Sequence, residues 1–264
     1  MAIEPVSVAV KDGQFNVPVY RAGSGEQLLY LHNAGGMSRG FTPDLQRLAE
    51  SYEVIAPVLP GWDDTEGLQH IDDIHDMVFF LQDLIDALQV RTPLNLLGHS
   101  IGGNFAAELA AARPDLVKKL VLVAPVGLWL DETPVADPFI LLPQDLPGLL
   151  FADPANPAVA ELFKPPADED ALAQAMYLQI TNFAAAGKFM WPIPDKGLKK
   201  RIHRIAAPTL LLWGKQDRLV PPAYGPVFAQ RIRNSHLVEI DSAGHMLPIE
   251  QTDRYVAEVT GFLG

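Results

Sequence analysis

The 264-residue sequence contains no cysteine. Disulfide bonds, thiolate nucleophiles and cysteine-based zinc sites are therefore excluded. The sequence is also poor in positive charge, since 20 Lys and Arg against 32 Asp and Glu give a formal net charge of −12. A negative field of this size repels phosphate backbones and anionic lipid surfaces. We therefore expect neither nucleic acid nor a membrane as a partner.

Long apolar runs are missing as well. No stretch reaches the roughly 18 uncharged apolar residues that a membrane-spanning helix needs. Residues Met1–Val10 include Glu4 and Pro5 and lack the basic and apolar regions of a secretory signal. We expect a cytoplasmic monomer or homodimer that acts on a small-molecule substrate.

Short apolar runs recur along the chain and are typical of buried strands. They are Val6–Val10, Val17–Tyr20, Leu28–Leu31, Val54–Val58, Leu94–Leu97, Leu120–Val123, Thr209–Trp213 and Leu237–Ile240. Helical patterns follow most of them from the third onward, at Asp73–Leu88, Asn104–Ala112, Ala223–Ile232 and Glu250–Phe262. Alternating strands and helices indicate a parallel sheet, whereas the short connection Lys11–Asn16 predicts that the first two strands are antiparallel. The predicted fold is α/β, with an eight-stranded, mostly parallel sheet flanked by helices.

The alternation stops after Ala124-Pro125 and resumes at Pro208. The segment Val126–Pro194 holds ten of the 23 prolines together with irregular apolar clusters. Because strands of one sheet lie on both sides of it, this segment is predicted to be a helical cap inserted after the sixth strand. We expect residues 127–199 to form the cap and residues 1–126 and 200–264 to form the core.

Gly98-His99-Ser100-Ile101-Gly102 directly follows a predicted strand and opens a predicted helix. A strand, a sharp turn and a helix form the setting of a nucleophile elbow, in which flanking glycines let the backbone fold back tightly. Ser100 is the predicted nucleophile. The structural alternative is a serine that caps a glycine-rich helix.

A serine hydroxyl needs a histidine base, which in turn needs a carboxylate to orient it. Asp217 follows the strand Thr209–Trp213, and His245 follows the last strand on a loop of small residues. These two are the predicted acid and base. Asp131 is an alternative acid; in the purely structural alternatives, Asp217 is a turn residue and His245 belongs to a surface loop.

Acyl transfer creates an oxyanion that two preorganised N–H groups must stabilise. One donor is normally the residue after the serine, here Ile101. The second is expected in the glycine-rich turn His32–Gly36, where the N–H of Ala34 is best placed.

With these motifs the sequence resembles the α/β-hydrolases, specifically the capped, cofactor-free serine hydrolases that include esterases, lactonases and carbon–carbon bond hydrolases. The resemblance implies that no metal or organic cofactor is needed. Asn33 stands where the family usually has glycine, and asparagine tolerates positive φ best among the other residues. Family dehalogenases and epoxide hydrolases carry aspartate in place of Ser100, and the carbon–carbon hydrolases usually carry tryptophan where this chain has Met246.

The remaining candidates concern the substrate. Apolar cap residues are expected to pack on one another and on the core, while a subset could line a pocket over Ser100 for an apolar group. They are Phe139, Ile140, Leu141, Leu142, Leu149, Leu150, Phe151, Phe183, Phe189, Met190 and Trp191. Asn33, Trp191 and Met246 are the predicted substrate contacts. The prediction is an ester or lactone hydrolase of a small, largely apolar substrate; the alternatives are a carbon–carbon bond hydrolase and a non-catalytic ligand receptor.

Two charged clusters are interpreted as structural. Acidic residues beside His70 and His75 complement the start of a predicted helix, with metal binding as the alternative. The basic residues Lys196, Lys199, Lys200, Arg201, His203 and Arg204 are typical of a solvated face, with a grip on a substrate carboxylate as the alternative.

Overall fold

The computed structural model describes residues 3–142, 144–162, 164–193 and 195–264. The described residues form one sheet of eight strands in the order β1-β2-β4-β3-β5-β6-β7-β8. The strands are β1 (Val6–Val10), β2 (Phe15–Ala22), β3 (Glu26–Leu31), β4 (Tyr52–Pro57), β5 (Leu94–His99), β6 (Val117–Val123), β7 (Thr209–Gly214) and β8 (Ser235–Ile240). β2 is antiparallel to both of its neighbours, and all pairs from β4 to β8 are parallel. The predicted α/β fold class is therefore confirmed.

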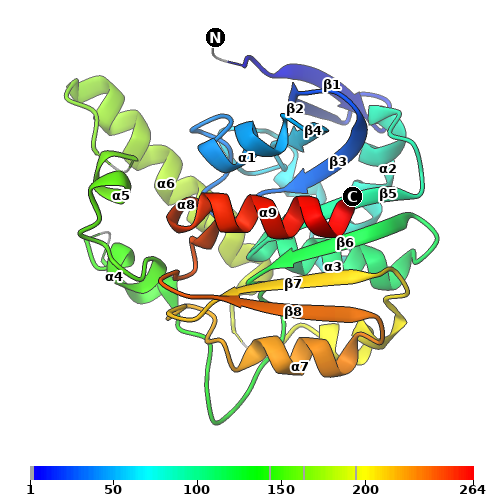
Figure 1. The fold of residues 1–264 in the computed structure, drawn as a ribbon. Helices are drawn as coiled ribbons and strands as arrows, with labels where there is room; N and C mark the ends of the chain where they lie inside the picture. The colour runs from blue at the N-terminus through cyan, green and yellow to red at the C-terminus, as the bar shows by residue number, and fades with distance from the viewer. Residues whose placement is uncertain (1–2, 143, 163, 194) are drawn as a thin grey trace.

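The helices lie on both faces of this sheet and beyond the carboxyl ends of its parallel strands (Figure 1). They are α1 (Pro43–Leu48), α2 (Ile74–Leu88), α3 (Ile101–Ala112), α4 (Leu146–Leu150), α5 (Pro157–Leu162), α6 (Glu169–Met190), α7 (Tyr224–Arg231), α8 (Leu247–Glu250) and α9 (Thr252–Leu263). Short 3-10 helices occupy Leu68–His70, Pro138–Ile140, Leu198–Lys200 and Ile202–Arg204. Within the described part of the chain, no helix combines the length and the apolarity that crossing a membrane would require.

The central strands are mostly apolar because helices cover both of their faces. Every residue of β5 and of β7 is buried, whereas the edge strand β1 is largely exposed. Several predicted boundaries differ from the observed ones by one to three residues, and two differences have a local cause. β4 ends at Pro57, before Val58, and the predicted helix Glu250–Phe262 is two helices, because the backbone of Gln251 (φ −132°, ψ 50°) leaves the helical region between α8 and α9.

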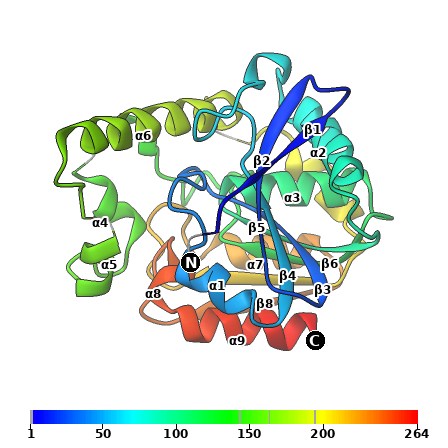
Figure 2. The ribbon, with the colours of Figure 1, turned by 90° about the horizontal axis from the view of Figure 1, so that it is seen from above.

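The segment predicted as a cap lies beyond the carboxyl ends of the parallel strands (Figure 1). Viewed from above, α6 runs away from the sheet on one side, and α4 and α5 lie at its far end (Figure 2). Only the C-terminal half of α6 contacts the core closely, since its buried residues are Asn182, Ala185, Ala186 and Phe189. The parallel strands therefore direct their terminal loops toward the underside of this segment.

Candidate active site

The turn between β5 and α3 has the backbone of a nucleophile elbow. Ser100 has φ 57° and ψ −115°, a strained conformation for a residue with a side chain. A Cβ added to Gly98 would lie 2.3 Å from the carbonyl oxygen of Gly102, and one added to Gly102 would lie 2.2 Å from that of Leu31. Both positions therefore require glycine. The Ser100 N–H donates to the carbonyl of Val123 at 2.9 Å, which fixes the turn to the neighbouring strand.

Asp217 and His245 are brought together from the loops after β7 and β8. His245 Nδ1 lies 2.8 Å from Asp217 Oδ2, and both side chains are buried. The other carboxylate oxygen of Asp217 accepts hydrogen bonds from the N–H groups of Leu219 and Val220, at 2.9 and 2.8 Å. Hydrogen bonds to both oxygens therefore fix the orientation of the Asp217 carboxylate. Asp131, the alternative acid, is exposed and accepts from the Trp129 indole instead.

His245 Nε2 is buried and has no hydrogen-bond partner among the described residues. His99, the residue before Ser100, donates from Nε2 to the carbonyl of His245 at 2.9 Å. The two imidazole ring centres are 5.3 Å apart. Ser100 and the free nitrogen of His245 thus belong to adjoining, hydrogen-bonded segments, although no hydrogen bond joins their side chains in this structure.

The loop after β3 forms a tight turn beside the elbow. The N–H of Gly36 donates to the carbonyl of Asn33, and the N–H of Gly35 donates to the Asn33 side-chain oxygen at 2.8 Å. Neither the N–H of Ala34 nor that of Ile101 donates to any group of the described residues. The two predicted oxyanion donors therefore have no acceptor within the described residues.

Two buried side chains form hydrogen bonds to this loop. The indole of Trp62 donates to the carbonyl of Ala34 at 3.1 Å. Asn182, on α6, donates to the carbonyl of Gly35 at 3.0 Å and to Asp63 Oδ1 at 2.7 Å, and its oxygen accepts from the Asp63 N–H at 2.8 Å. The cap helix is thus hydrogen bonded to the turn that carries Ala34.

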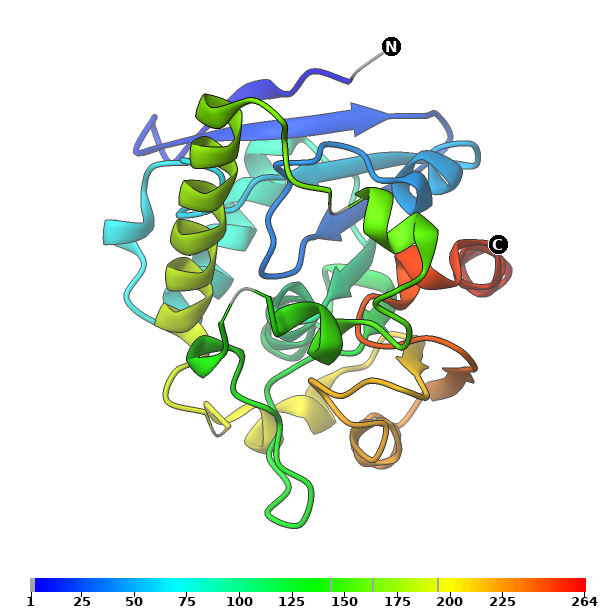
Figure 3. The same ribbon diagram turned by 90° about the vertical axis from the view of Figure 1, so that its left-hand side faces the viewer.

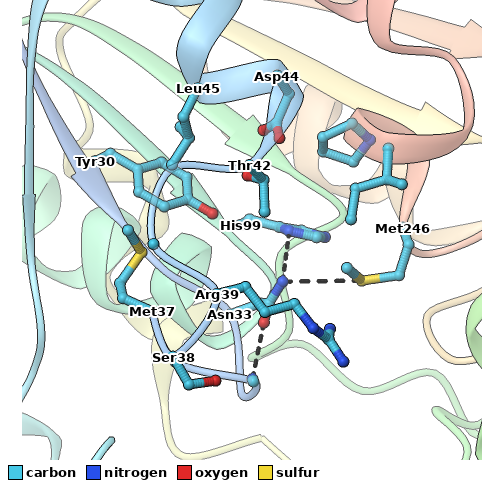
Figure 4. Close-up of a pocket in the computed structure, with 15 residues that line it drawn as sticks. Tyr30, Asn33, Met37, Ser38, Arg39, Thr42, Asp44, Leu45, His99 and Met246 are labelled. Carbon is cyan, nitrogen blue, oxygen red and sulfur yellow. Dashed lines mark hydrogen bonds between the residues drawn. The ribbon is translucent and has the colours of Figure 1, made fainter. Parts of the chain in front are cut away.

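A cavity of about 60 Å³ lies behind this turn (Figure 4). Asn33, His99 and Met246 line it on one side, and Asp44, Tyr30 and Arg39 are among its other lining residues. Asp44 is buried with its Oδ1 unpartnered, and burial raises the pKa of its carboxyl to about 6.

A larger groove of about 670 Å³ lies within the cap. Its lining is apolar except for Gln179 and comprises Pro138, Phe139, Leu141, Leu146, Met176, Gln179, Ile180, Phe183, Ala184, Gly187 and Trp191. In the view onto the cap, α6 runs along one side and the segment with α4 along the other (Figure 3). The expectation that apolar cap residues pack away from solvent was wrong for Ile140, Leu142 and Trp191, which are mostly exposed. Trp191 lines the groove and donates to Asp137.

The charged clusters have structural partners. Asp73 caps α2 by accepting from the N–H groups of His75 and Asp76. In the basic segment, Arg201 forms a two-pronged bond to the buried Glu108, and Arg204 donates to a backbone carbonyl of α3. Both guanidinium groups therefore form hydrogen bonds to residues of α3.

Comparison with known proteins identifies the family to which this fold belongs. A profile described as the alpha/beta hydrolase fold matches residues 27–252. The chain belongs to the α/β-hydrolase family. Among curated relatives, a 2-hydroxy-6-oxononadienedioate/2-hydroxy-6-oxononatrienedioate hydrolase of Pseudomonas putida is 27% identical over 97% of this chain and 95% of its own length. Lipase 1 of Psychrobacter immobilis is 25% identical over 87% of this chain and 74% of its own.

Solved structures agree on the fold of this α/β-hydrolase. A thermophilic esterase from Thermogutta terrifontis superposes with a TM-score of 0.77 at 21% identity, with 98% of each chain covered. The curated relatives therefore include proteins named as a dienedioate hydrolase and as a lipase.

Sequence reasoning missed His99, Asp63 and Asn182 as parts of this site. His99 lies within the elbow motif itself, and Asn182 is one polar residue on the otherwise apolar stripe of α6 with Ala185, Ala186 and Phe189. A polar side chain on a buried helical face requires a partner. A polar residue on an apolar helical stripe was therefore the feature of the sequence that could have identified Asn182.

Proposed function

We propose that this α/β-hydrolase cleaves a carboxylic ester or lactone through Ser100, His245 and Asp217. The observation that carries the proposal is the buried pair of His245 Nδ1 and Asp217 Oδ2 at 2.8 Å, which leaves Nε2 of His245 without a hydrogen-bond partner among the described residues. A carboxylate on Nδ1 keeps the proton there, so Nε2 is the basic nitrogen.

In the proposed reaction, Ser100 Oγ attacks the carbonyl carbon while His245 Nε2 takes its proton. The N–H groups of Ile101 and Ala34 stabilise the oxyanion of the tetrahedral intermediate. Collapse breaks the bond to the alcohol, which leaves with the proton from His245, and an acyl-enzyme remains on Ser100. Water then attacks the acyl-enzyme with the same base and releases the acid.

Carbon–carbon bond hydrolysis of a vinylogous diketone is the second candidate, and it is favoured by the names of several relatives. Two observations favour the ester. The basic segment that would grip a substrate carboxylate has Arg201 and Arg204 bound to α3. The residue after His245 is Met246, which lines the small cavity with Asn33 and His99. Trp191, the other predicted substrate contact, lines the apolar cap groove.

The test is treatment with a fluorophosphonate, followed by intact mass and by turnover of p-nitrophenyl butyrate. We expect one adduct on the unmutated protein, with turnover lost in proportion, and neither adduct nor turnover above about one thousandth in Ser100→Ala. A dienoate substrate turned over far faster than any ester would favour the second candidate instead. Absence of both adduct and turnover in the unmutated protein would contradict the proposal and favour a receptor.

A further inference from the structure

The side chain of Asn33 lies where three loops of the candidate site meet (Figure 4). Its Nδ2 is 3.1 Å from Nδ1 of His99, in the elbow, and 3.8 Å from the sulfur of Met246, which follows the candidate base. Its Oδ1 accepts from the N–H of Gly35 within its own turn. A hydrogen-bonded path therefore runs from the oxyanion turn through His99 to the carbonyl of His245.

The partners of this path fix the orientation of each group in it. The N–H of Gly35 can only donate, so the oxygen of the Asn33 carboxamide must face it and the nitrogen must face His99. The carboxamide nitrogen donates, so Nδ1 of His99 must accept and carries no proton. The carbonyl of His245 only accepts, so Nε2 of His99 carries the proton. Both nitrogens of His99 are satisfied only in the neutral Nε2–H tautomer.

Burial supports the neutral form as well. The His99 side chain is 2% exposed. Burial, followed by the neighbouring His245, lowers the pKa of His99 to about 3. The charged groups that line the same small cavity as His99 are Asp44 and Arg39.

Neutrality at this position has a consequence for catalysis. His245 becomes an imidazolium when it takes the proton of Ser100. A second positive ring whose centre lies 5.3 Å away would disfavour that state. A neutral His99 orients the backbone of the base without this repulsion.

We propose that Asn33 is a positioning residue that holds His99 as its neutral Nε2–H tautomer and so couples the oxyanion turn to the loop of His245. The catalytic part of this inference rests on the proposed roles of Ser100 and His245. The tautomer does not, because the hydrogen bonds alone determine it.

The first experiment needs no variant. Long-range ¹H–¹⁵N spectra of histidine-labelled protein should show His99 with a protonated Nε2 and a bare Nδ1 from about pH 5 to pH 8. An Nδ1–H tautomer or an imidazolium in this range would overturn the proposal, whatever the activity of the protein.

The second experiment is Asn33→Asp, which keeps the shape of the side chain and the acceptor for Gly35 but removes the donor to His99. Nδ1 of His99 can bond the new carboxylate only when it is protonated, so we expect the pKa of His99 to rise by about two units. Above that pKa His99 is neutral and its hydrogen bond to residue 33 is lost. We expect kcat for p-nitrophenyl butyrate to fall about 10- to 100-fold with KM changed less than threefold. The new carboxylate raises the pKa of His99 whatever role Asn33 has, so kcat is the deciding readout. An unchanged kcat would overturn the proposal.

A double-mutant cycle tests whether Asn33 acts through His99. In a His99→Gln background, Asn33→Asp should change kcat by less than threefold. An equal loss in both backgrounds would show that Asn33 acts elsewhere. The matched control is Gln69→Glu, because Gln69 makes the corresponding amide-to-imidazole contact with His70 in an exposed position. Failure of the proposed function would be seen separately, as turnover in the unmutated protein that Ser100→Ala does not remove.

Discussion

The loops at the carboxyl edge of the sheet and the groove in the cap are built from opposite kinds of side chain. At the sheet edge, buried polar groups such as Asp217, His245 and His99 each have specified partners. The groove is lined by apolar side chains, and Met176, Ile180 and Trp191 are largely exposed at it. Hydrogen bonds fix geometry, whereas apolar surfaces tolerate ligands of varied shape. We therefore expect changes at the edge to alter rate and stability, and changes in the groove to alter the choice of substrate.

The largest effect is expected for Asp217→Asn. Asp217 Oδ1 accepts from two backbone N–H groups, so the amide oxygen must stay there and the new NH₂ must face His245. Nδ1 of His245 then has to accept, which moves the proton to Nε2 and removes the base. We expect kcat for p-nitrophenyl butyrate to fall about 10³- to 10⁴-fold. The control Asp131→Asn should stay within twofold, and a larger loss there than in Asp217→Asn would reassign the acid.

The next prediction concerns Asp44, a buried carboxylate near the candidate site with one oxygen that lacks a hydrogen-bond partner among the described residues. Its folded-state pKa is raised to about 6 from 3.8, so the folded protein binds more protons than the unfolded chain between these values. Its contribution to stability is therefore present below about pH 4 and is lost as the pH rises through about 6. Asp44→Asn places an NH₂ at the oxygen that has no partner. We expect its stability relative to the parent to increase from pH 4 to pH 7 by up to about 3 kcal/mol.

Urea unfolding at several pH values measures this difference for Asp44→Asn. The control Asp83→Asn makes the same substitution at an exposed position and should change the free energy of unfolding by less than about 0.5 kcal/mol. A constant difference for Asp44→Asn across the same range would mean that the buried carboxylate is stabilised by a partner in the folded protein.

Asn182 joins the two regions, because it reaches from the cap helix to the oxyanion turn. Asn182→Ala leaves the carbonyl of Gly35 and two groups of Asp63 without their partner. We expect the free energy of unfolding to fall by about 2 kcal/mol and kcat/KM to fall about tenfold. Gln174 is a matched control on α6, since its amide bonds Asp64 in an exposed position. Gln174→Ala should change stability by less than about 0.5 kcal/mol, and equal losses in both variants would remove the special role of Asn182.

The contrast between the two regions also explains what the sequence could predict. Strands such as Leu94–His99 are fully buried and mostly apolar because helices cover both faces of the sheet, and the loop after each parallel strand then lies at the carboxyl edge of the sheet. Ser100, Asp217 and His245 could therefore be assigned to one edge from their positions after strands. The position of Asn33 within the oxyanion turn was predictable, but its bond to His99 was not.

Contacts between distant segments depend on how the chain packs. Asn182 and Asp63 are 119 residues apart, and nothing in the local pattern of either pairs them. In the cap, apolar composition predicted burial, but Ile140 and Leu142 lie on a segment with too little neighbouring surface to cover them. Composition indicates how much surface a segment can bury, whereas the neighbours determine whether it does so.

The smallest effect is expected in the groove and tests the cap side of the comparison. Ala184 lines the groove, so Ala184→Trp should fill part of its 670 Å³. Each methylene buried contributes about 0.8 kcal/mol, so an ester whose chain enters the groove loses binding when the space is occupied. We expect kcat/KM for p-nitrophenyl octanoate to fall about tenfold while that for the acetate ester stays within twofold. Ala175→Trp places the same ring on an exposed position of α6 that does not line the groove, and it should leave both substrates unchanged. If Ala184→Trp slowed acetate and octanoate equally, the groove would act on the catalytic loops, and the separation between a region for rate and a region for substrate choice would be wrong.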